Sequence, residues 1–215
     1  MPSTGVAGIL LAAGEGKRFD GPGHKLLADF GGRPLVCWAA EALARAGLAA
    51  SCVVTGAVDV EHLVEPLGLA VVANPHWRNG QASSLRAGLA WCREGGFTAA
   101  VLGLGDQPLL GPGPWRAVAA ATGAPILTAT YGGRRRPPVR LDRSVWDLVP
   151  ADGDEGARAL MRRRPDLVGE VACEGDPADV DTPEDLCRFA AAGGQAGGPA
   201  SGGPARPIPG CDRER

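Results

Sequence analysis

The chain of 215 residues, with 45% hydrophobic and 21% charged side chains, is long enough for one domain with a buried core. Its 22 basic and 24 acidic residues give a net charge of −2, which excludes the basic balance of general nucleic-acid binders, so we expect no nucleic-acid partner. Apolar runs stay well below the roughly 18 residues of a membrane span, and the first one lacks a basic leader, which predicts a cytoplasmic protein without a membrane partner.

The six cysteines are scattered along the chain. They form no CxxC pair and have no companion histidines at the spacing of a metal site. We therefore expect ordinary thiols and neither a disulfide framework nor a zinc site.

Short apolar runs alternate with amphipathic segments over the first 131 residues. In chain order we expect a strand at 6–11, a helix starting at Pro34 and ending before Gly47, a strand at 51–55, a helix at 60–67, a strand at 69–73, a helix at 84–93, a strand at 98–104, a helix at 114–122 and a strand at 125–131. Such alternation predicts an α/β fold, a three-layer Rossmann-like arrangement with a mostly parallel sheet covered on both faces.

The alternation changes after Tyr131. We expect an extended segment at 137–141, a helix at 155–164, a strand at 167–172 and a closing helix at 182–192. Thr182 followed by Pro183 is typical of a helix N-terminus. Seven Gly and four Pro among residues 193–215 predict a disordered tail, so the domain is expected to comprise residues 1–192.

The loop after the first expected strand is rich in glycine and cations. The dinucleotide pattern GxGxxG fails there because Phe19 occupies the third glycine position, and a P-loop fails because Leu11 and Arg18 stand where Gly and Ser or Thr are required. Lys17 and Lys25, which both fall in this loop, are the only lysines of the chain. Backbone N–H groups and cations in such a loop can bind an anion, and a solvent-facing turn is the alternative.

Two aspartates follow apolar segments. Asp106 comes two residues after the end of the expected strand 98–104, and Asp181 comes just before the closing helix. A carboxylate at the end of a buried strand is costly unless it is paired or binds a cation, and Mg²⁺ takes one or two carboxylates together with phosphate oxygens. A turn or cap role is the alternative for each, and Asp179 and Asp185 are expected to be local capping partners.

A third polar segment spans residues 74–89. It turns at Asn79-Gly80, and we expect the helix to begin at Ser83 or Ser84. Hydroxyls and free N–H groups at a helix start can recognise a base, a ribose or an anion. The alternative is that these serines only cap the helix and that Trp77 belongs to the core.

Taken in order, the segments LAAGEGKRF with Lys25, FGGRPLV, NPHWRNGQASSLRAGL, GLGDQPLL, GDEGARAL and DVDTPEDL are similar to the MobA-like nucleotidyltransferases. The resemblance runs from Gly8 to Leu186 and is strongest to the molybdenum cofactor cytidylyltransferase branch. It implies a sheet of the nucleotide-diphospho-sugar transferase type. It also implies transfer of a nucleotidyl group from an NTP to a phosphorylated acceptor, with release of pyrophosphate.

The resemblance also implies roles for individual residues. The catalytic residues would be Lys25, Arg18 and Asp106, and Mg²⁺ would be held by Asp106 and Asp181. The nucleotide-binding residues would be Leu11, Ala12, Ala13, Gly14, Gly16, Lys25, Ser83 and Ser84. Ala13 at the third position of LAAG favours CTP over GTP in this family. The implied acceptor is molybdopterin, and a molybdoenzyme would be the client for the product.

The sequence departs from the family at two places. Residues 21–24 lengthen the loop before Lys25, and Arg134, Arg135 and Arg136 precede Pro137 where the family commonly has Gly-His-Pro-Val. The three arginines would clamp a phosphate or form a solvated charge run, which leaves the acceptor open. The alternative functions are transfer to another phosphorylated acceptor, a nicotine-blue-type oxidoreductase and a non-catalytic cofactor carrier, although the incomplete GxGxxG disfavours a standard nicotinamide site.

Overall fold

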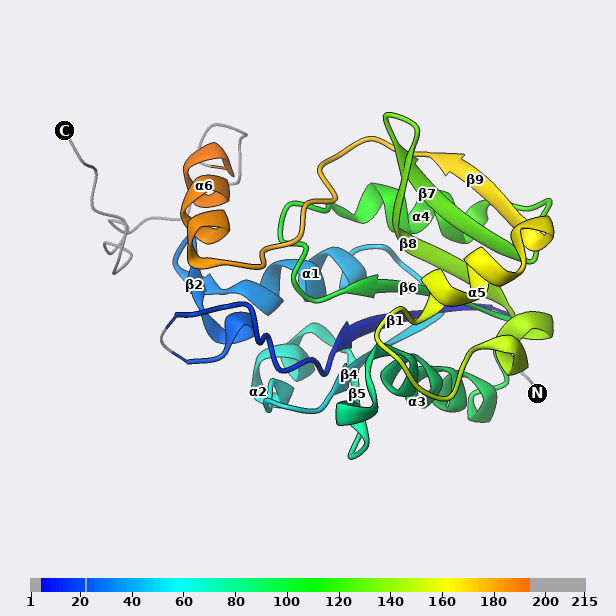
Figure 1. Cartoon of the computed structure of the whole chain (residues 1–215), viewed down its shortest axis with the longest axis horizontal. Helices are drawn as coiled ribbons and strands as arrows, with labels where there is room; N and C mark the ends of the chain where they lie inside the picture. The colour runs from blue at the N-terminus through cyan, green and yellow to red at the C-terminus, as the bar shows by residue number, and fades with distance from the viewer. Residues whose placement is uncertain (1–4, 22, 194–215) are drawn as a thin grey trace.

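The computed structural model describes residues 5–21 and 23–193, with the side chains up to Phe189. Its centre is a seven-stranded sheet in the order β5-β4-β1-β6-β8-β7-β9, in which only the β8 pairings are antiparallel (Figure 1). The strands are β1 (Val6–Ala12), β4 (Ala50–Thr55), β5 (Ala70–Ala73), β6 (Ala99–Leu104), β7 (Ile126–Tyr131), β8 (Arg134–Asp142) and β9 (Val168–Ala172). A separate hairpin pairs β2 (Asp29–Phe30) with β3 (Arg33–Pro34).

Helices cover both faces of the sheet. They are α1 (Leu35–Ala44), α2 (Glu61–Val64), α3 (Gln81–Glu94), α4 (Pro112–Ala120) and α5 (Ala157–Arg163), and a further helix, α6 (Pro183–Gly193), lies away from both faces. Along β1, Ile9 and Leu11 join the core cluster that contains residues of α3 and α5, whereas Leu10 and Ala12 join the cluster that contains residues of α1, α2 and α4. This alternation follows from the two-residue period of a strand, and it confirms the expected three-layer α/β fold.

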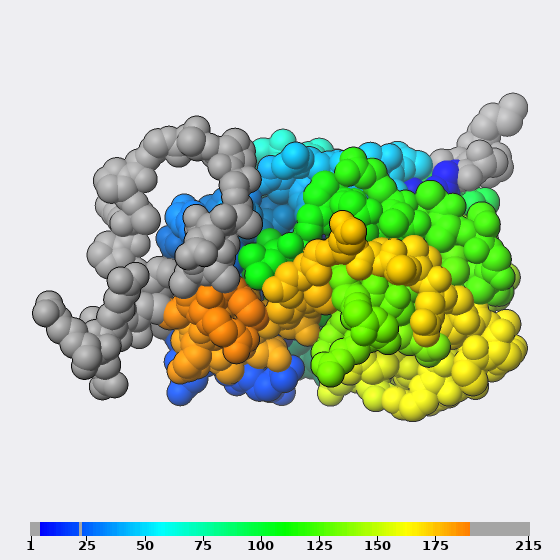
Figure 2. All heavy atoms as spheres, turned by 90° about the horizontal axis from the view of Figure 1, so that it is seen from above, coloured from blue at the N-terminus to red at the C-terminus, as the bar shows by residue number. Residues whose placement is uncertain are grey.

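A third, smaller core cluster connects α6 to the amino-terminal part of the chain. Phe30 of β2, Leu35 of α1, and Leu186 and Phe189 of α6 meet there with Val180. Figure 1 shows α6 standing beside β2, at the end of the molecule away from β9. In Figure 2 the segment between β9 and α6 runs along the surface to reach this position.

The closing helix starts as predicted. The Thr182 hydroxyl accepts a hydrogen bond from the Asp185 N–H at 3.2 Å, and the Asp185 carboxylate accepts from the N–H groups of Asp181 and Thr182, each at 3.1 Å. This reciprocal arrangement satisfies several of the N–H groups that a helix start leaves unpaired. The expected tail from Gly193 lies, apart from Gly193 itself, outside the described residues.

The structure corrects several sequence-based boundaries. Helix α3 begins at Gln81, so Ser83 and Ser84 lie in its first turn and neither is its N-cap; Gly80 takes that position with a φ of 95°, which favours glycine. The helix expected at 60–67 is α2 followed by a 3₁₀ turn, with Pro66 at the start of that turn. Pro34 precedes α1 as its cap rather than being its first residue.

The described cysteines include four free thiols, Cys37, Cys52, Cys92 and Cys173. Cys187 is disulfide-bonded, which corrects the expectation of thiols throughout. Cysteine spacing alone does not reveal such a bond because distance along the chain does not fix distance in space. Within residues 5–21 and 23–193, no helix has the length and apolar character needed to cross a membrane.

Helix α3 approaches the sheet closely at Gly88. A Cβ atom added there would lie 2.7 Å from Cγ2 of Ile9, a fully buried β-branched residue of β1. We predict that Gly88→Ala lowers the free energy of unfolding by about 1–3 kcal/mol, because the methyl group overpacks this contact.

The matched control is Gly111→Ala, just before helix α4, where an added Cβ meets nothing within 4 Å and the backbone is extended with a φ of −74°. This variant should change the free energy of unfolding by less than about 1 kcal/mol, because alanine adopts this backbone conformation without strain. Urea unfolding of both variants measures the difference, and equal effects would contradict the close α3–β1 contact.

Candidate active site

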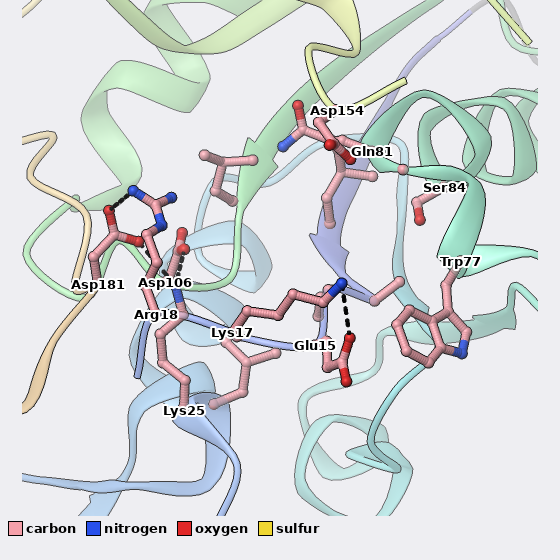
Figure 3. Close-up of a pocket in the computed structure, with 18 of the residues that line it drawn as sticks. Glu15, Lys17, Arg18, Lys25, Trp77, Gln81, Ser84, Asp106, Asp154 and Asp181 are labelled. Atoms are coloured by element: carbon pink, nitrogen blue, oxygen red, sulfur yellow. Dashed lines mark hydrogen bonds and ion pairs between the residues drawn. The ribbon is translucent and has the colours of Figure 1, made fainter. Parts of the chain in front are cut away.

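A cleft of about 660 Å³ opens at the carboxyl ends of β1 and β6. It contains most of the residues that the sequence singled out (Figure 3). The expected site residues that line it are Leu11, Ala12, Ala13, Gly14, Gly16, Arg18, Lys25, Ser84, Asp106 and Asp181. Parallel strands bring their carboxyl ends to the same edge of the sheet, which explains why loops distant in sequence meet here.

Lys25 is held in place by its neighbour His24. The His24 Nδ1 atom accepts a hydrogen bond from the Leu26 N–H at 3.2 Å, and Nε2 lies 2.9 Å from the Gly14 carbonyl oxygen, to which it donates. These two contacts start the 3₁₀ turn Lys25–Leu27 and tie it to the glycine-rich loop after β1. The longer stretch at 21–24 therefore supplies the residue that docks Lys25 into the cleft.

The Lys25 ammonium lies between two carboxylates. Its Nζ is 2.7 Å from Asp106 Oδ2 and 3.4 Å from Asp181 Oδ1, and only 10% of the lysine side chain is exposed. Arg18, which is largely exposed, reaches Asp181 Oδ2 at 2.9 Å (Figure 3). Buried charges require such partners, and the structure joins all four residues into one ion-pair network.

The two carboxylates fit a magnesium ion in their donor chemistry. Asp106 Oδ1 is buried and has no hydrogen-bond partner among the described residues, so one carboxylate oxygen is left for another ligand. Mg²⁺ prefers carboxylate oxygens and completes its shell with waters and phosphate oxygens. No group of three or more metal-binding side chains occurs in the described part of the chain, so a cation here would depend on such additional ligands.

A third carboxylate lies beside this network. Asp179 accepts a hydrogen bond from Gln107 Nε2 at 2.8 Å. Burial raises the pKa of Asp179 above its ordinary value, and the negative charges of Asp106 and Asp181 act in the same direction, while the Gln107 hydrogen bond opposes them. Three carboxylates thus gather at this end of the cleft against the two cations Lys25 and Arg18, which favours a further cation there.

The structure separates the roles of the two serines. The buried Asn74 side chain donates from Nδ2 to both hydroxyl oxygens at 3.0 Å. The Ser83 hydroxyl lies 2.9 Å from the carbonyl oxygens of His76 and Gly80, and Ser83 is outside the lining of the cleft. Ser84 lines the cleft on the side opposite Asp181 (Figure 3), and its hydroxyl proton has no acceptor among the described residues, so it can donate to a ligand.

Sequence reasoning missed several lining residues, among them Arg78, Gly80, Gln81 and Asp154. Asp154 belongs to the quoted segment GDEGARAL but was given no role. It reaches the cleft because the loop at 153–156 docks on the start of α3: the Ala82 N–H donates to the Gly153 carbonyl at 2.9 Å. A core position was the alternative for Trp77, and its side chain both packs against the core and lines the cleft.

The three arginines at the start of β8 are exposed and lie outside the lining of this cleft. Arg135 pairs with Glu170 at 2.7 Å, with both side chains about half exposed. Surface pairs of this kind contribute about 0–1 kcal/mol, so Arg135 behaves as a solvated surface charge in this structure.

The chain belongs to the MobA-like NTP transferase family, whose domain matches residues 8–168. It is thus a nucleotidyltransferase of the MobA-like class, with a sheet of the nucleotidyltransferase type.

Two curated relatives align over nearly their whole length. The nicotine blue oxidoreductase of Paenarthrobacter nicotinovorans is 34% identical over 200 residues, covering 86% of this chain and 96% of the relative. The molybdenum cofactor guanylyltransferase of Cereibacter sphaeroides is 31% identical over 192 residues, covering 84% and 93%.

Among solved structures, Rv0371c from Mycobacterium tuberculosis H37Rv is similar to this chain. It is 28% identical with a TM-score of 0.73, covering 89% of this chain and 100% of that one. Its complex with manganese gives 26% identity and a TM-score of 0.69, covering 87% and 99%.

The contacts of His24 make its contribution to the stability of the fold depend on pH. Burial lowers the pKa of its imidazole below the ordinary value of 6.5, the Lys25 charge adds to this, and the bond to the Gly14 carbonyl opposes it. The folded chain then binds this proton less readily than the unfolded chain, so the contribution of His24 to stability is complete above about pH 6.5 and is lost as the pH falls toward the folded pKa.

An NMR titration of the His24 ring measures this pKa directly. We expect a value below 6.5, and His24→Gln should reduce the loss of unfolding free energy between pH 7.5 and 5.5. A folded pKa at or above 6.5 would contradict a half-buried, neutral ring.

Proposed function

We propose that the protein transfers a CMP group from CTP to a phosphorylated acceptor, molybdopterin, with Mg²⁺ held by Asp106 and Asp181. The observation that carries this proposal is the Lys25 ammonium packed between those two carboxylates at the open edge of the sheet. A cleft with a glycine-rich loop, cations and paired carboxylates suits a triphosphate with its metal ion.

In the proposed reaction, a phosphate oxygen of the acceptor attacks the α-phosphorus of CTP and the bond to the β-phosphate breaks. A Mg²⁺ ion held by Asp106 and Asp181 would supply charge neutralisation for the phosphates. Lys25 and Arg18 offset the negative charge that develops on the leaving pyrophosphate, and the amides of the loop after β1 align the phosphate chain. The acceptor phosphate is already ionised, so the chain need supply no general base or nucleophile.

Two features support a divalent cation at this place. Asp106 has a buried oxygen without a hydrogen-bond partner among the described residues, and the carboxylates cluster at one end of the cleft. The manganese complex of the related Rv0371c supports the same interpretation by analogy.

The nucleotide end of the proposed site contains Ala13 and Ser84. The Ala13 side chain takes more room beside the cleft than the glycine that accompanies GTP in this family, which favours the smaller pyrimidine. The Ser84 hydroxyl faces the cleft as a donor and suits an oxygen acceptor of a base or ribose. Preference for CTP is the point at which this proposal departs from the guanylyltransferase relatives.

A second candidate function follows from the similarity to the nicotine blue oxidoreductase. A nicotinamide site of the usual kind needs the third glycine of GxGxxG, where this chain has Phe19. The Phe19 side chain packs against the third core cluster, so the loop is built around a large ring at that position. We therefore favour nucleotidyl transfer over hydride transfer for this site.

The deciding experiment measures pyrophosphate release by the purified protein with Mg²⁺, molybdopterin and CTP, GTP or ATP in turn, with the nucleotide product identified by mass. We predict release with CTP and a loss of at least about 10²-fold in Asp106→Asn, because electrostatic contacts at the reacting phosphates dominate such catalysis.

The control is Asp147→Asn, whose exposed carboxylate pairs with Arg93 on the surface. It should retain wild-type turnover. Turnover of Asp106→Asn at the wild-type rate would contradict the assigned role, and NADH oxidation without pyrophosphate release from any nucleotide would favour the oxidoreductase instead.

A further inference from the structure

Gln107 follows Asp106 directly and is almost completely buried, with 1% of its surface exposed. Its Nε2 atom donates to the Pro177 carbonyl oxygen and to Asp179 Oδ1, both at 2.8 Å. A backbone carbonyl oxygen only accepts hydrogen bonds, so the Pro177 contact fixes which end of the amide faces this segment. The side chain thus bridges the loop after β6 to a segment seventy residues further along the chain.

That segment, residues 177–181, leads to the second carboxylate of the proposed metal site. The Val180 N–H donates to the Asp106 carbonyl oxygen at 2.9 Å, and the fully buried Val180 side chain belongs to the third core cluster. The N–H of Asp181 itself donates to the carboxylate of Asp185, a residue in the first turn of α6. Asp181 is therefore restrained from both sides, by the Gln107 bridge and Val180 before it and by the start of α6 after it.

The Gln107 side chain also provides Asp179 with a neutral hydrogen-bond donor. Asp179 lies close to Asp106 and Asp181, and all three carboxylates repel one another. The Gln107 amide binds Asp179 without adding a positive charge, so the charge of Lys25 remains with Asp106 and Asp181. A positively charged side chain in place of Gln107 would compete with a metal ion for the negative charge of these carboxylates.

We propose that Gln107 is a positioning residue that holds Asp181 opposite Asp106 and thereby sets the affinity of this pair for a divalent cation. The inference rests on the proposed function, because it takes these two aspartates as the metal ligands. Residues that orient metal ligands commonly affect affinity by 10-fold to 100-fold when they are replaced.

The test uses Mn²⁺ alone as the probe, with the full chain and free Mn²⁺ followed by EPR. Gln107→Leu removes both hydrogen bonds at nearly constant volume, and we expect Mn²⁺ binding to weaken by about 10-fold to 100-fold. In steady-state assays the same variant should raise the KM for Mn²⁺ more than it lowers kcat at saturating metal, which a general loss of folded protein would not do.

A matched pair at Asp179 separates the hydrogen bond from the charge and keeps the test decisive if Gln107→Leu does not fold. Asp179→Asn removes the negative charge but retains an oxygen that accepts from Gln107, whereas Asp179→Ala removes both the charge and the acceptor. Mn²⁺ affinity should therefore be about fivefold lower in Asp179→Ala than in Asp179→Asn, the equivalent of one hydrogen bond. Equal affinities for these two variants would overturn the inference.

Asp106→Asn distinguishes failure of this inference from failure of the proposed function. If Asp106→Asn abolishes Mn²⁺ binding while a folded Gln107→Leu binds as wild type does, the positioning role is wrong and the metal site stands. If Asp106→Asn also binds Mn²⁺ as wild type does, the assigned metal site is wrong, and the role of Gln107 is overturned with it.

Discussion

The arrangement of the cleft depends on one buried ammonium group. Lys25 contributes a charge that is nine-tenths shielded from solvent, and it meets Asp106 from the loop after β6 and Asp181 from the start of α6. A buried charge without partners would be strongly destabilising, so the three segments must meet for the edge of the sheet to fold in this form. The third core cluster supports the same meeting, because it packs α6 and residue Val180 against Phe30 and Leu35.

This constraint explains why α6 lies where it does. The helix covers neither face of the central sheet and stands instead beside the β2–β3 hairpin (Figure 1). Its apolar side chains pack in the third core cluster, and the residue just before its start, Asp181, contacts Lys25. The Thr182 and Asp185 caps and the Gln107 bridge fix that start from the two sides. The segment between β9 and α6 therefore contributes both to the packing of α6, through Val180, and to the cleft, through Asp181.

The same network gives the cleft two chemically different ends. One end, at Asp106 and Asp181, concentrates carboxylates and cations, whereas the other end presents Trp77 and the Ser84 hydroxyl (Figure 3). The glycine-rich loop after β1 runs between them, so an elongated ligand with a charged part and a flat polar part matches the lining. A nucleoside triphosphate has this form.

The sequence predicted the central strands and their helices well because buried strands and amphipathic helices have strong periodicity. It did not predict the β2–β3 hairpin, because two-residue strands carry no periodicity. It also placed the start of α3 too late, because serines are common N-caps and a sequence pattern does not reveal the positive φ of Gly80. Asp106 and Asp181 were found because carboxylates after apolar segments are unusual. Asp154 and the difference between Ser83 and Ser84 depend on loop docking and on the Asn74 hydrogen bonds, which only three-dimensional contacts reveal.

The central claim is that Lys25, Asp106 and Asp181 form the place where a divalent cation and the phosphates of a nucleotide meet. A crystal structure with Mn²⁺ and a non-hydrolysable CTP analogue, with the metal located by its anomalous scattering, tests this most directly. The account predicts a manganese peak coordinated by Asp106 and Asp181 and by phosphate oxygens of the analogue, with the base toward Ser84. A metal peak away from both aspartates, or a nucleotide bound outside this cleft, would contradict it.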